Sequence, residues 1–138
     1  MAEPELIHAP LTRSIIGAFF DVYNELGYGF LEHVYVVALE HELRTRGHQV
    51  ARELSVAVVY KGLPLATQRL DMVVDGRVVV EVKSTPMLHA TAARQLYNYL
   101  RATALDVGLI LHFGPRPSVQ RLECRTSRDP TKPIAPSI

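Results

Sequence analysis

The 138-residue chain contains one cysteine, Cys124, and no tryptophan. A single cysteine cannot form an internal disulfide, and chains without disulfides are typical of reducing compartments. The sequence also lacks an apolar run long enough to span a bilayer, and its acidic first residues do not form the apolar core of a signal peptide. We therefore expect a cytoplasmic protein that has no membrane partner.

No sign of charge dominates, since 15 lysines and arginines balance 14 aspartates and glutamates. A nucleic-acid site would therefore need charge gathered locally. The chain has no glycine-rich phosphate loop and no nucleophile elbow for acyl transfer. Its six histidines lack the paired spacing of a zinc site. These absences argue against a P-loop enzyme, an α/β-hydrolase and a zinc-binding domain.

The length and a hydrophobic content of 48% predict a single domain with a proper core. Apolar periodicity predicts helices over residues 11–26, 31–46 and 90–103, and strands over 49–60, 68–74, 77–83, 106–113 and 118–124. This order predicts an α/β chain (α+β, with a mixed sheet) in which helices flank a central sheet and strand 77–83 lies in its middle. We expect residues 1–10 to be a loose arm, 11–124 the domain and 125–138 a disordered tail.

Residues 68–84 contain two β-rich runs joined at Asp75-Gly76, a strong hairpin signal. The even positions on either side of the turn, from Leu70 to Val74 and from Val78 to Val82, are apolar and predict one face of the hairpin. Asp71, Glu81 and Lys83 occupy odd positions and so predict the opposite face. A two-residue turn would separate Asp71 from Glu81 by shifting the register by one. We therefore predict a three-residue connection or a bulge near Gly76.

Two carboxylates and a lysine on one face have two interpretations. They could be a solvated charge cluster, in which each cross-strand pair contributes about 0.2–1 kcal/mol. They could also form a hydrolytic site, in which carboxylates bind Mg²⁺ or Mn²⁺ and the ammonium orients the attacking water. The strand Val78–Lys83 is apolar enough to be internal, and buried charges usually have a partner or a metal. This favours the hydrolytic interpretation.

Asp71 followed by Glu81-Val82-Lys83 resembles the bipartite motif of the PD-(D/E)XK nuclease superfamily. The segment Gly29-Phe-Leu-Glu-His-Val-Tyr35 is identical to the motif that names the GxxExxY proteins, a family placed in that superfamily. Shorter matches extend the resemblance over roughly residues 11–114: Ala38-Leu39, Tyr60-Lys61-Gly62, Gln95–Leu100 and Val107–Leu109. The resemblance implies a restriction-endonuclease-like core.

The resemblance also implies roles for single residues. Asp71 and Glu81 would be metal ligands together with the backbone carbonyl of Val82, and Lys83 would position or activate the attacking water. Glu32 would bring a third carboxylate to the metal. Gln95 and Tyr99 resemble a Q-x-x-x-Y element that helps hold the metal site and DNA. Arg69 and Tyr35 are further candidates for substrate binding.

The helical candidates also have structural interpretations. Glu32 could simply be a first-turn carboxylate favoured by the helix dipole. Tyr99 could be a core aromatic residue with a bonded hydroxyl, and Gln95 a partly buried amide. The sequence departs from the family pattern at Ala93-Arg94, where a glutamate often precedes the position of Gln95, and at His112, where asparagine is common.

Three functions remain open from the sequence. The first is a Mg²⁺- or Mn²⁺-dependent nuclease that hydrolyses DNA. The second is a nucleic-acid-binding module that keeps the nuclease fold without catalysis. The third is a protein that self-assembles through exposed apolar surface. Because restriction-like folds often dimerise, a homodimer is expected by analogy.

Overall fold

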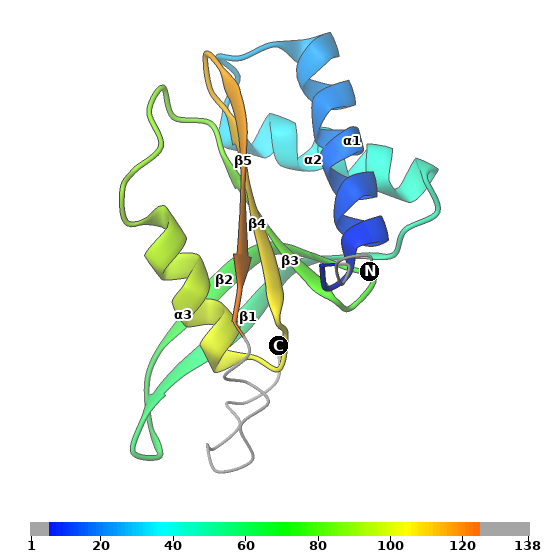
Figure 1. Cartoon of the computed structure of the whole chain (residues 1–138). Helices are drawn as coiled ribbons and strands as arrows, with labels where there is room; N and C mark the ends of the chain where they lie inside the picture. Colours follow the sequence, from blue (N-terminus) through cyan, green and yellow to red (C-terminus); the bar gives the residue numbers. More distant parts are fainter. Residues whose placement is uncertain (1–5, 125–138) are drawn as a thin grey trace, which may run out of the picture.

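Five strands form one mixed sheet in the computed structural model, which describes residues 6–124 (Figure 1). The strands lie side by side in chain order: β1 (Val50–Tyr60), β2 (Leu63–Val74), β3 (Val78–Lys83), β4 (Val107–Phe113) and β5 (Pro117–Glu123). Strands β3 and β4 are parallel, and the other neighbours are antiparallel. The central position predicted for the strand that ends at Lys83 is therefore confirmed.

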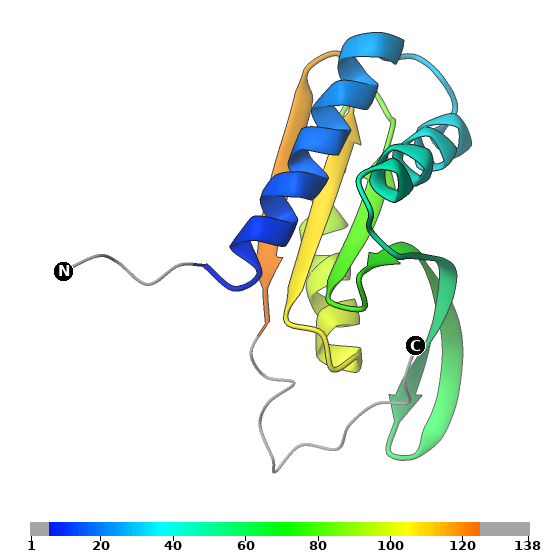
Figure 2. The same ribbon diagram turned by 90° about the vertical axis from the view of Figure 1, so that its right-hand side faces the viewer.

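Helices cover both faces of the sheet (Figure 2). Helices α1 (Ala9–Leu26) and α2 (Glu32–Thr45) bury one face in a larger core, and α3 (Ala92–Ala102) buries the other face in a smaller one. This arrangement confirms the predicted α/β class with a mixed sheet flanked by helices. Within residues 6–124, no helix combines the length and the apolar character needed to span a bilayer.

Helix α1 begins at Ala9 and so includes the end of the segment predicted as a loose arm. Arg121 on β5 donates a hydrogen bond to the carbonyl of Ile7 at 2.6 Å, which ties this end of the chain to the sheet. Residues 1–5 and 125–138 lie outside the described residues. The loose arm and the disordered tail therefore remain predictions.

The connection between β2 and β3 has the length that the carboxylate spacing required. Val74 pairs with Val78, so residues 75–77 form a three-residue connection, as predicted. Asp75 and Gly76 both have positive φ angles, 52° and 64°, and aspartate and glycine tolerate this conformation better than most residues. The same register places Asp71 opposite Glu81.

The predicted apolar face does not continue to Leu70. Met72, Val74, Val78, Val80 and Val82 belong to the core under α1 and α2, whereas Leu70 belongs to the core under α3. Strand β1 has a positive φ of 56° at Glu53, between the pairs Arg52–Met72 and Leu54–Leu70. At this bend the even-numbered side chains of β2 turn from the face covered by α1 and α2 to the face covered by α3. A strict alternation with a period of two therefore fails across the bend.

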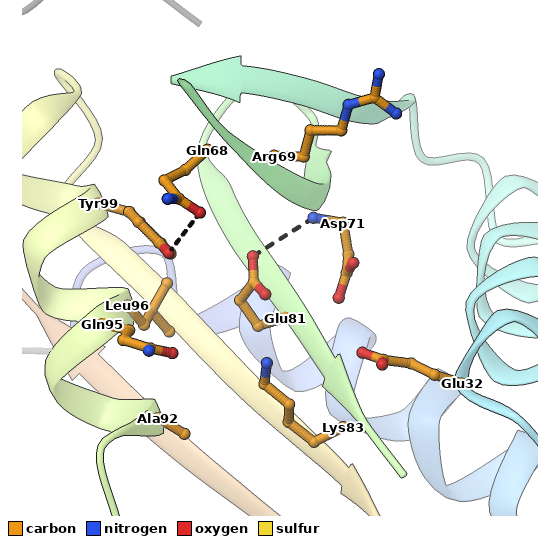
Figure 3. A pocket seen from close by; sticks show the side chains of 10 residues that line it. All are labelled: Glu32, Gln68, Arg69, Asp71, Glu81, Lys83, Ala92, Gln95, Leu96 and Tyr99. Atoms are coloured by element: carbon orange, nitrogen blue, oxygen red, sulfur yellow. Dashed lines mark hydrogen bonds between the residues drawn. The ribbon is translucent and has the colours of Figure 1, made fainter. Parts of the chain in front are cut away.

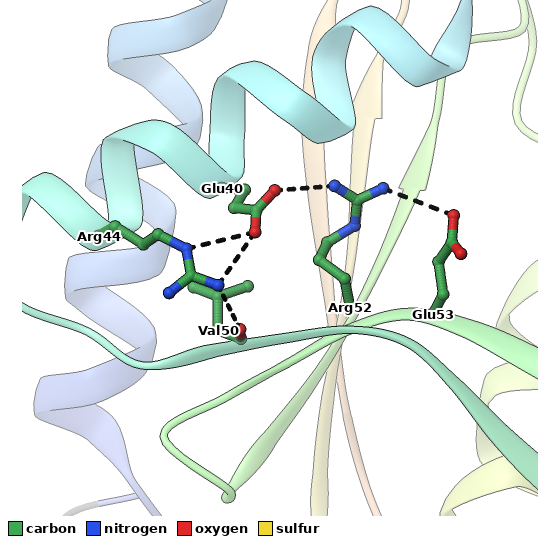
Figure 4. A network of polar contacts seen from close by, with 5 residues as sticks. All are labelled: Glu40, Arg44, Val50, Arg52 and Glu53. Atoms are coloured by element: carbon green, nitrogen blue, oxygen red, sulfur yellow. Dashed lines mark hydrogen bonds and ion pairs between the residues drawn. The ribbon is translucent and has the colours of Figure 1, made fainter.

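A polar network braces β1 just before this bend (Figure 4). Arg52 donates to Glu40 on α2 at 2.8 Å, and Arg44 on the same helix donates to the carbonyl of Val50 at 2.8 Å. Burial alone would raise the pKa of Glu40, but its hydrogen bonds with Arg52 and Arg44 lower it. The network therefore holds α2 against β1, which pairs with the strand that carries Asp71.

Candidate active site

Strands β2 and β3 separate where Asp71 and Glu81 face each other. Their ladder ends at the pair Met72–Val80, and side chains take over beyond it. The backbone N–H of Val82 donates to Asp71 Oδ2 at 2.7 Å, and the N–H of Asp71 donates a longer bond of 3.4 Å to Glu81 Oε1 (Figure 3). Both carboxylates therefore lie in the fork between the two strands.

The fork opens into a cavity of about 310 Å³. Side chains from α2, β2, β3 and α3 line it: Glu32, Gln68, Arg69, Asp71, Glu81, Lys83, Ala92, Gln95, Leu96 and Tyr99 (Figure 3). All the side chains predicted for the site line this cavity except that of Tyr35. Residues that are 60 positions apart in the chain, such as Glu32 and Ala92, thus meet around one space.

The acidic groups of the cavity are held in surroundings that disfavour their charged forms. Burial, and then the negative charge of Asp71, raise the pKa of Glu81 to about 8. Burial also raises the pKa of Asp71, although the bond from Val82 N–H and the charge of Lys83 oppose this. Burial and the charge of Asp71 raise the pKa of Glu32. A cation among these groups would relieve their mutual repulsion.

Lys83 lies two residues after Glu81 on β3, and its ammonium reaches into the same cavity (Figure 3). Its positive charge lowers the pKa of Glu81, Asp71 and Glu32 in opposition to burial. An ammonium beside carboxylates can orient a water molecule and offset charge that develops on a phosphate oxygen. Lys83 is therefore placed to contact a water molecule or a phosphate oxygen beside the carboxylates.

The oxygen donors of the cavity suit a hard divalent cation. Within residues 6–124, no three acidic, histidine or cysteine side chains already form a compact metal-binding group. Glu32, Asp71 and Glu81 nevertheless share one cavity, and Mg²⁺ or Mn²⁺ prefers such carboxylate oxygens. Because the N–H and C=O of one strand residue point to the same edge, the Val82 carbonyl faces the Asp71 side as its N–H does. The donor set fits the metal, with rotation of side chains needed for them to converge.

Helix α3 forms the wall opposite the strands. Gln95 lies at the cavity, and the hydroxyl of Tyr99 donates to Gln68 Oε1 at 3.3 Å. Burial, and then the negative charge of Glu81, raise the pKa of Tyr99. Helix α3 packs closely against β4 at Gly108. A Cβ atom at this position would lie only 2.9 Å from the side chain of Leu96. The small residue at 108 therefore helps to set the width of the cavity.

The sequence did not identify Gln68 as a site residue. Gln68 lies on β2 beyond the exchange of faces at Asp71, so an alternation counted from Met72 misplaces it. The hydrogen bond with Tyr99 across 31 residues has no local signal either. Only the packing of α3 against β2 brings these two side chains together.

Tyr35 is corrected from a substrate-binding residue to a structural one. Its side chain is completely buried and its ring stacks on Phe113 at a centroid distance of 4.3 Å. Its hydroxyl donates to the carbonyl of Gly27 at 2.8 Å and accepts the N–H of Phe30 at 3.2 Å. Tyr35 therefore holds the loop that leads into Glu32.

His112, the departure from the family pattern, is also buried and structural. Its Nε2 atom lies 2.6 Å from the carbonyl oxygen of Thr85, two residues after Lys83. A Cβ atom at Gly114 would lie 2.6 Å from the imidazole, so the ring needs a glycine beside it. This contact of His112 with Thr85 thus holds the backbone in place just after β3.

Comparison with known proteins agrees with this geometry. The family model described as the PD-(D/E)XK nuclease superfamily matches residues 9–122, which include every residue that lines the cavity. Searches of curated proteins and of solved structures found no significant match.

Proposed function

Because the chain belongs to the PD-(D/E)XK nuclease superfamily, we propose that it is a Mg²⁺- or Mn²⁺-dependent nuclease that hydrolyses phosphodiester bonds in DNA. The observation that carries the proposal is the shared cavity of Asp71, Glu81 and Lys83 at the fork between β2 and β3. The raised pKa of Glu81 supports it, because burial and the charge of Asp71 disfavour a second carboxylate there until a cation lies between the two.

Each residue has a role in this proposal. Asp71, Glu81 and Glu32 hold the metal with the Val82 carbonyl, and a bound metal ion would polarise the phosphate and activate a water molecule. Lys83 orients the water and offsets the charge on the phosphate. Gln95 and Tyr99 form the wall against which the nucleic acid lies.

Arg69 lies at the mouth of the cavity and is the candidate for gripping a phosphate. Its side chain is 74% exposed, and its guanidinium lies 3.7 Å from the carboxylate of Glu53. Such an exposed ion pair contributes little to stability, so a phosphate can compete for the arginine.

Cleavage assays test the proposal. Labelled DNA is tested in single-stranded and in double-stranded form, and at least one form should be cut with Mg²⁺ or Mn²⁺ and left intact with EDTA. Since loss of an outer-sphere partner alone costs metal enzymes about 10–100-fold, Asp71→Asn should lower the rate by at least about a hundredfold. Lys83→Ala should also lower it strongly. Asp21→Asn and Lys61→Ala, which change residues that do not line the cavity, should cut as wild type does.

A nucleic-acid-binding module without catalysis is the second candidate. The observation that favours it is the hydrogen bond between Asp71 and Val82 N–H, which already occupies one carboxylate oxygen. Salt-sensitive DNA binding without metal-stimulated cleavage, retained in Asp71→Asn, would support this candidate over the nuclease.

We also infer that the chain belongs to the GxxExxY family within the superfamily, since residues 29–35 carry that motif in full. The motif's tyrosine packs against the core and its glutamate lines the cavity, which supports a joint structural role. A cytoplasmic location, suggested by the single cysteine, and a homodimer complete the proposal. Light scattering of the purified protein tests the dimer.

A further inference from the structure

The loop between α1 and α2 exposes large apolar side chains just before a residue that lines the cavity. Tyr28, Phe30 and Leu31 are 61%, 48% and 80% exposed. Leu31 directly precedes Glu32, whose carboxylate lines the cavity. We call residues 28–31 the apolar loop.

The apolar loop is held in place by the core of the domain. The hydroxyl of Tyr35 forms hydrogen bonds with the loop before and after Tyr28, at Gly27 O and Phe30 N. The rings of Phe30 and Tyr35 meet edge to face at a centroid distance of 6.0 Å. The exposed side chains are therefore presented from a fixed backbone, which lowers the entropic cost of binding to them.

The apolar loop also lies at the catalytic end of the sheet. Lys83 pairs in parallel with His112, so β3 and β4 end together, and Tyr35 stacks on the next residue, Phe113. Figure 1 shows the connection between α1 and α2 at the same end as the connection from β4 to β5. A nucleotide chain that crosses the cavity can therefore continue over this loop.

The charges that line the cavity do not suit a long grip on duplex phosphates. Among the described residues, only two cations, Arg69 and Lys83, line it, and the proposed function assigns its three carboxylates, Glu32, Asp71 and Glu81, to the metal. Non-specific duplex binding relies on many pairs between lysine or arginine and phosphate, whereas single strands are also held by bases stacked on exposed rings. The bases of an intact duplex are stacked inward and cannot reach such rings.

We propose that the apolar loop stacks unpaired bases next to the cavity, and that the substrate is therefore single-stranded nucleic acid, including single-stranded ends. This inference rests on the proposed function, since it names the substrate class of the same site. Tyr28 supplies the ring face, and Leu31 supplies apolar contact between that ring and Glu32. Phe30 supports the loop from below through its contact with Tyr35.

Fluorescence anisotropy in EDTA tests the inference without any cleavage. Labelled oligothymidylate should bind wild type more tightly than a duplex of the same length does. Tyr28→Ala should weaken the single-strand affinity by about tenfold, which is the loss typical of one stacked base, and Leu31→Ala by a smaller factor. Tyr28→Trp should restore the affinity, because it keeps an aromatic face.

The hairpin between β1 and β2 offers a matched control. Tyr60 is 57% exposed, much like Tyr28, but it lies near the hairpin turn and does not line the cavity. Tyr60→Ala should bind oligothymidylate as wild type does. If Tyr28→Ala also binds as wild type, or if the duplex binds as tightly as the single strand, the inference is overturned.

Two further outcomes separate this inference from the proposed function. Binding that depends on Tyr28, in a protein that shows no metal-stimulated cleavage, supports the stacking loop and removes only the nuclease. A wild-type dimer that dissociates in Tyr28→Ala and Leu31→Ala, with unchanged oligothymidylate binding, assigns the apolar loop to self-association and overturns the inference. Light scattering of the same samples distinguishes these cases.

Discussion

Val82 donates its backbone N–H to the carboxylate of Asp71, and this bond replaces the ladder between β2 and β3. The side chain of Asp71 thereby occupies the gap that opens where the two strands part. An unpaired N–H on a buried strand would cost about 1–3 kcal/mol, so the fork stays open only because a side chain satisfies it. The separation that makes room for the cavity is thus stabilised by one of the carboxylates proposed to bind metal.

Mn²⁺ should stabilise the wild-type protein against thermal unfolding, and Asp71→Asn should reduce this effect. A ligand that binds only the folded state, at a hundredfold excess over its Kd, adds about 2.7 kcal/mol. Differential scanning fluorimetry with Mn²⁺ and with EDTA measures the gain without any assay of cleavage. Asp21→Asn should keep the full gain. An equal gain in Asp71→Asn would mean that Asp71 is not a ligand.

The stability of the metal-free protein should fall as the pH rises from about 4.5 to about 8. The folded state raises the pKa of Glu81 from 4.5 to about 8, so folding takes up a proton in this range. The stabilisation is complete below the unfolded pKa and is lost as the pH rises through the folded one. Glu81→Gln should flatten the profile and make the protein more stable than wild type at the alkaline end.

Urea unfolding in EDTA across this pH range measures that profile. Glu25→Gln, which changes an exposed residue on α1, is the control and should leave the slope of wild type unchanged. A profile in Glu81→Gln that is as steep as that of wild type would assign the slope to other groups.

Tyr35→Phe should destabilise the protein and loosen the loop before Glu32. The change leaves Gly27 O and Phe30 N without their hydroxyl partner, at a cost of about 1–3 kcal/mol. Chemical denaturation measures the free energy, and amide exchange at Phe30 measures the local effect. Tyr23→Phe is the matched control, because its hydroxyl binds Gly114 O and Pro115 O instead. It should lower stability and leave exchange at Phe30 unchanged.

Asp75→Asn should weaken the protein at neutral pH and have less effect in acid. Burial alone would raise the pKa of Asp75, but the hydrogen bonds with His48 and the Gln49 N–H lower it. The carboxylate therefore contributes stability above its unfolded pKa, and this contribution is lost as the pH falls through the folded one. We expect a loss of about 1 kcal/mol at neutral pH, measured by urea unfolding.

The Nε2 atom of His48 also lies 2.7 Å from the hydroxyl oxygen of Ser14 on α1. Ser14, His48 and Asp75 therefore form a series of hydrogen bonds that joins this helix to the hairpin turn. Ser14→Ala removes the hydroxyl at the other end of this hydrogen-bond series and keeps the carboxylate of Asp75. This substitution should therefore lower the stability at every pH, without changing the further loss of stability that occurs as Asp75 is protonated in acid. If the stability of Ser14→Ala no longer fell in acid, the contribution of Asp75 would depend on all three residues of the series rather than on His48 and Gln49 alone.

The local pattern predicted much of the fold because its signals are short in range. Alternation identified β3 as an internal strand, and parity excluded a plain two-residue turn after Val74 in favour of a three-residue connection or a bulge. The same alternation failed at Leu70, because the positive φ at Glu53 on the neighbouring strand turns the faces over. A strand's own residues do not report a bend in its partner.

The candidate site divides in the same way. Asp71, Glu81 and Lys83 could be grouped from the sequence because one hairpin carries them all. Gln68 could not be found and Tyr35 was misassigned, because their positions depend on contacts with Tyr99 and Phe113 far along the chain.

The sequence by itself determined the order of the elements, the exclusion of a plain two-residue turn and the acid–acid–lysine set on neighbouring strands, because backbone periodicity and parity act over a few residues. Only the tertiary structure decided that Glu32 and Gln95 share a cavity with this set, and that Tyr35 supports it from the core. The physical reason is packing. Which side chains a helix presents to a cavity depends on the surfaces it must bury against elements that are remote in the chain.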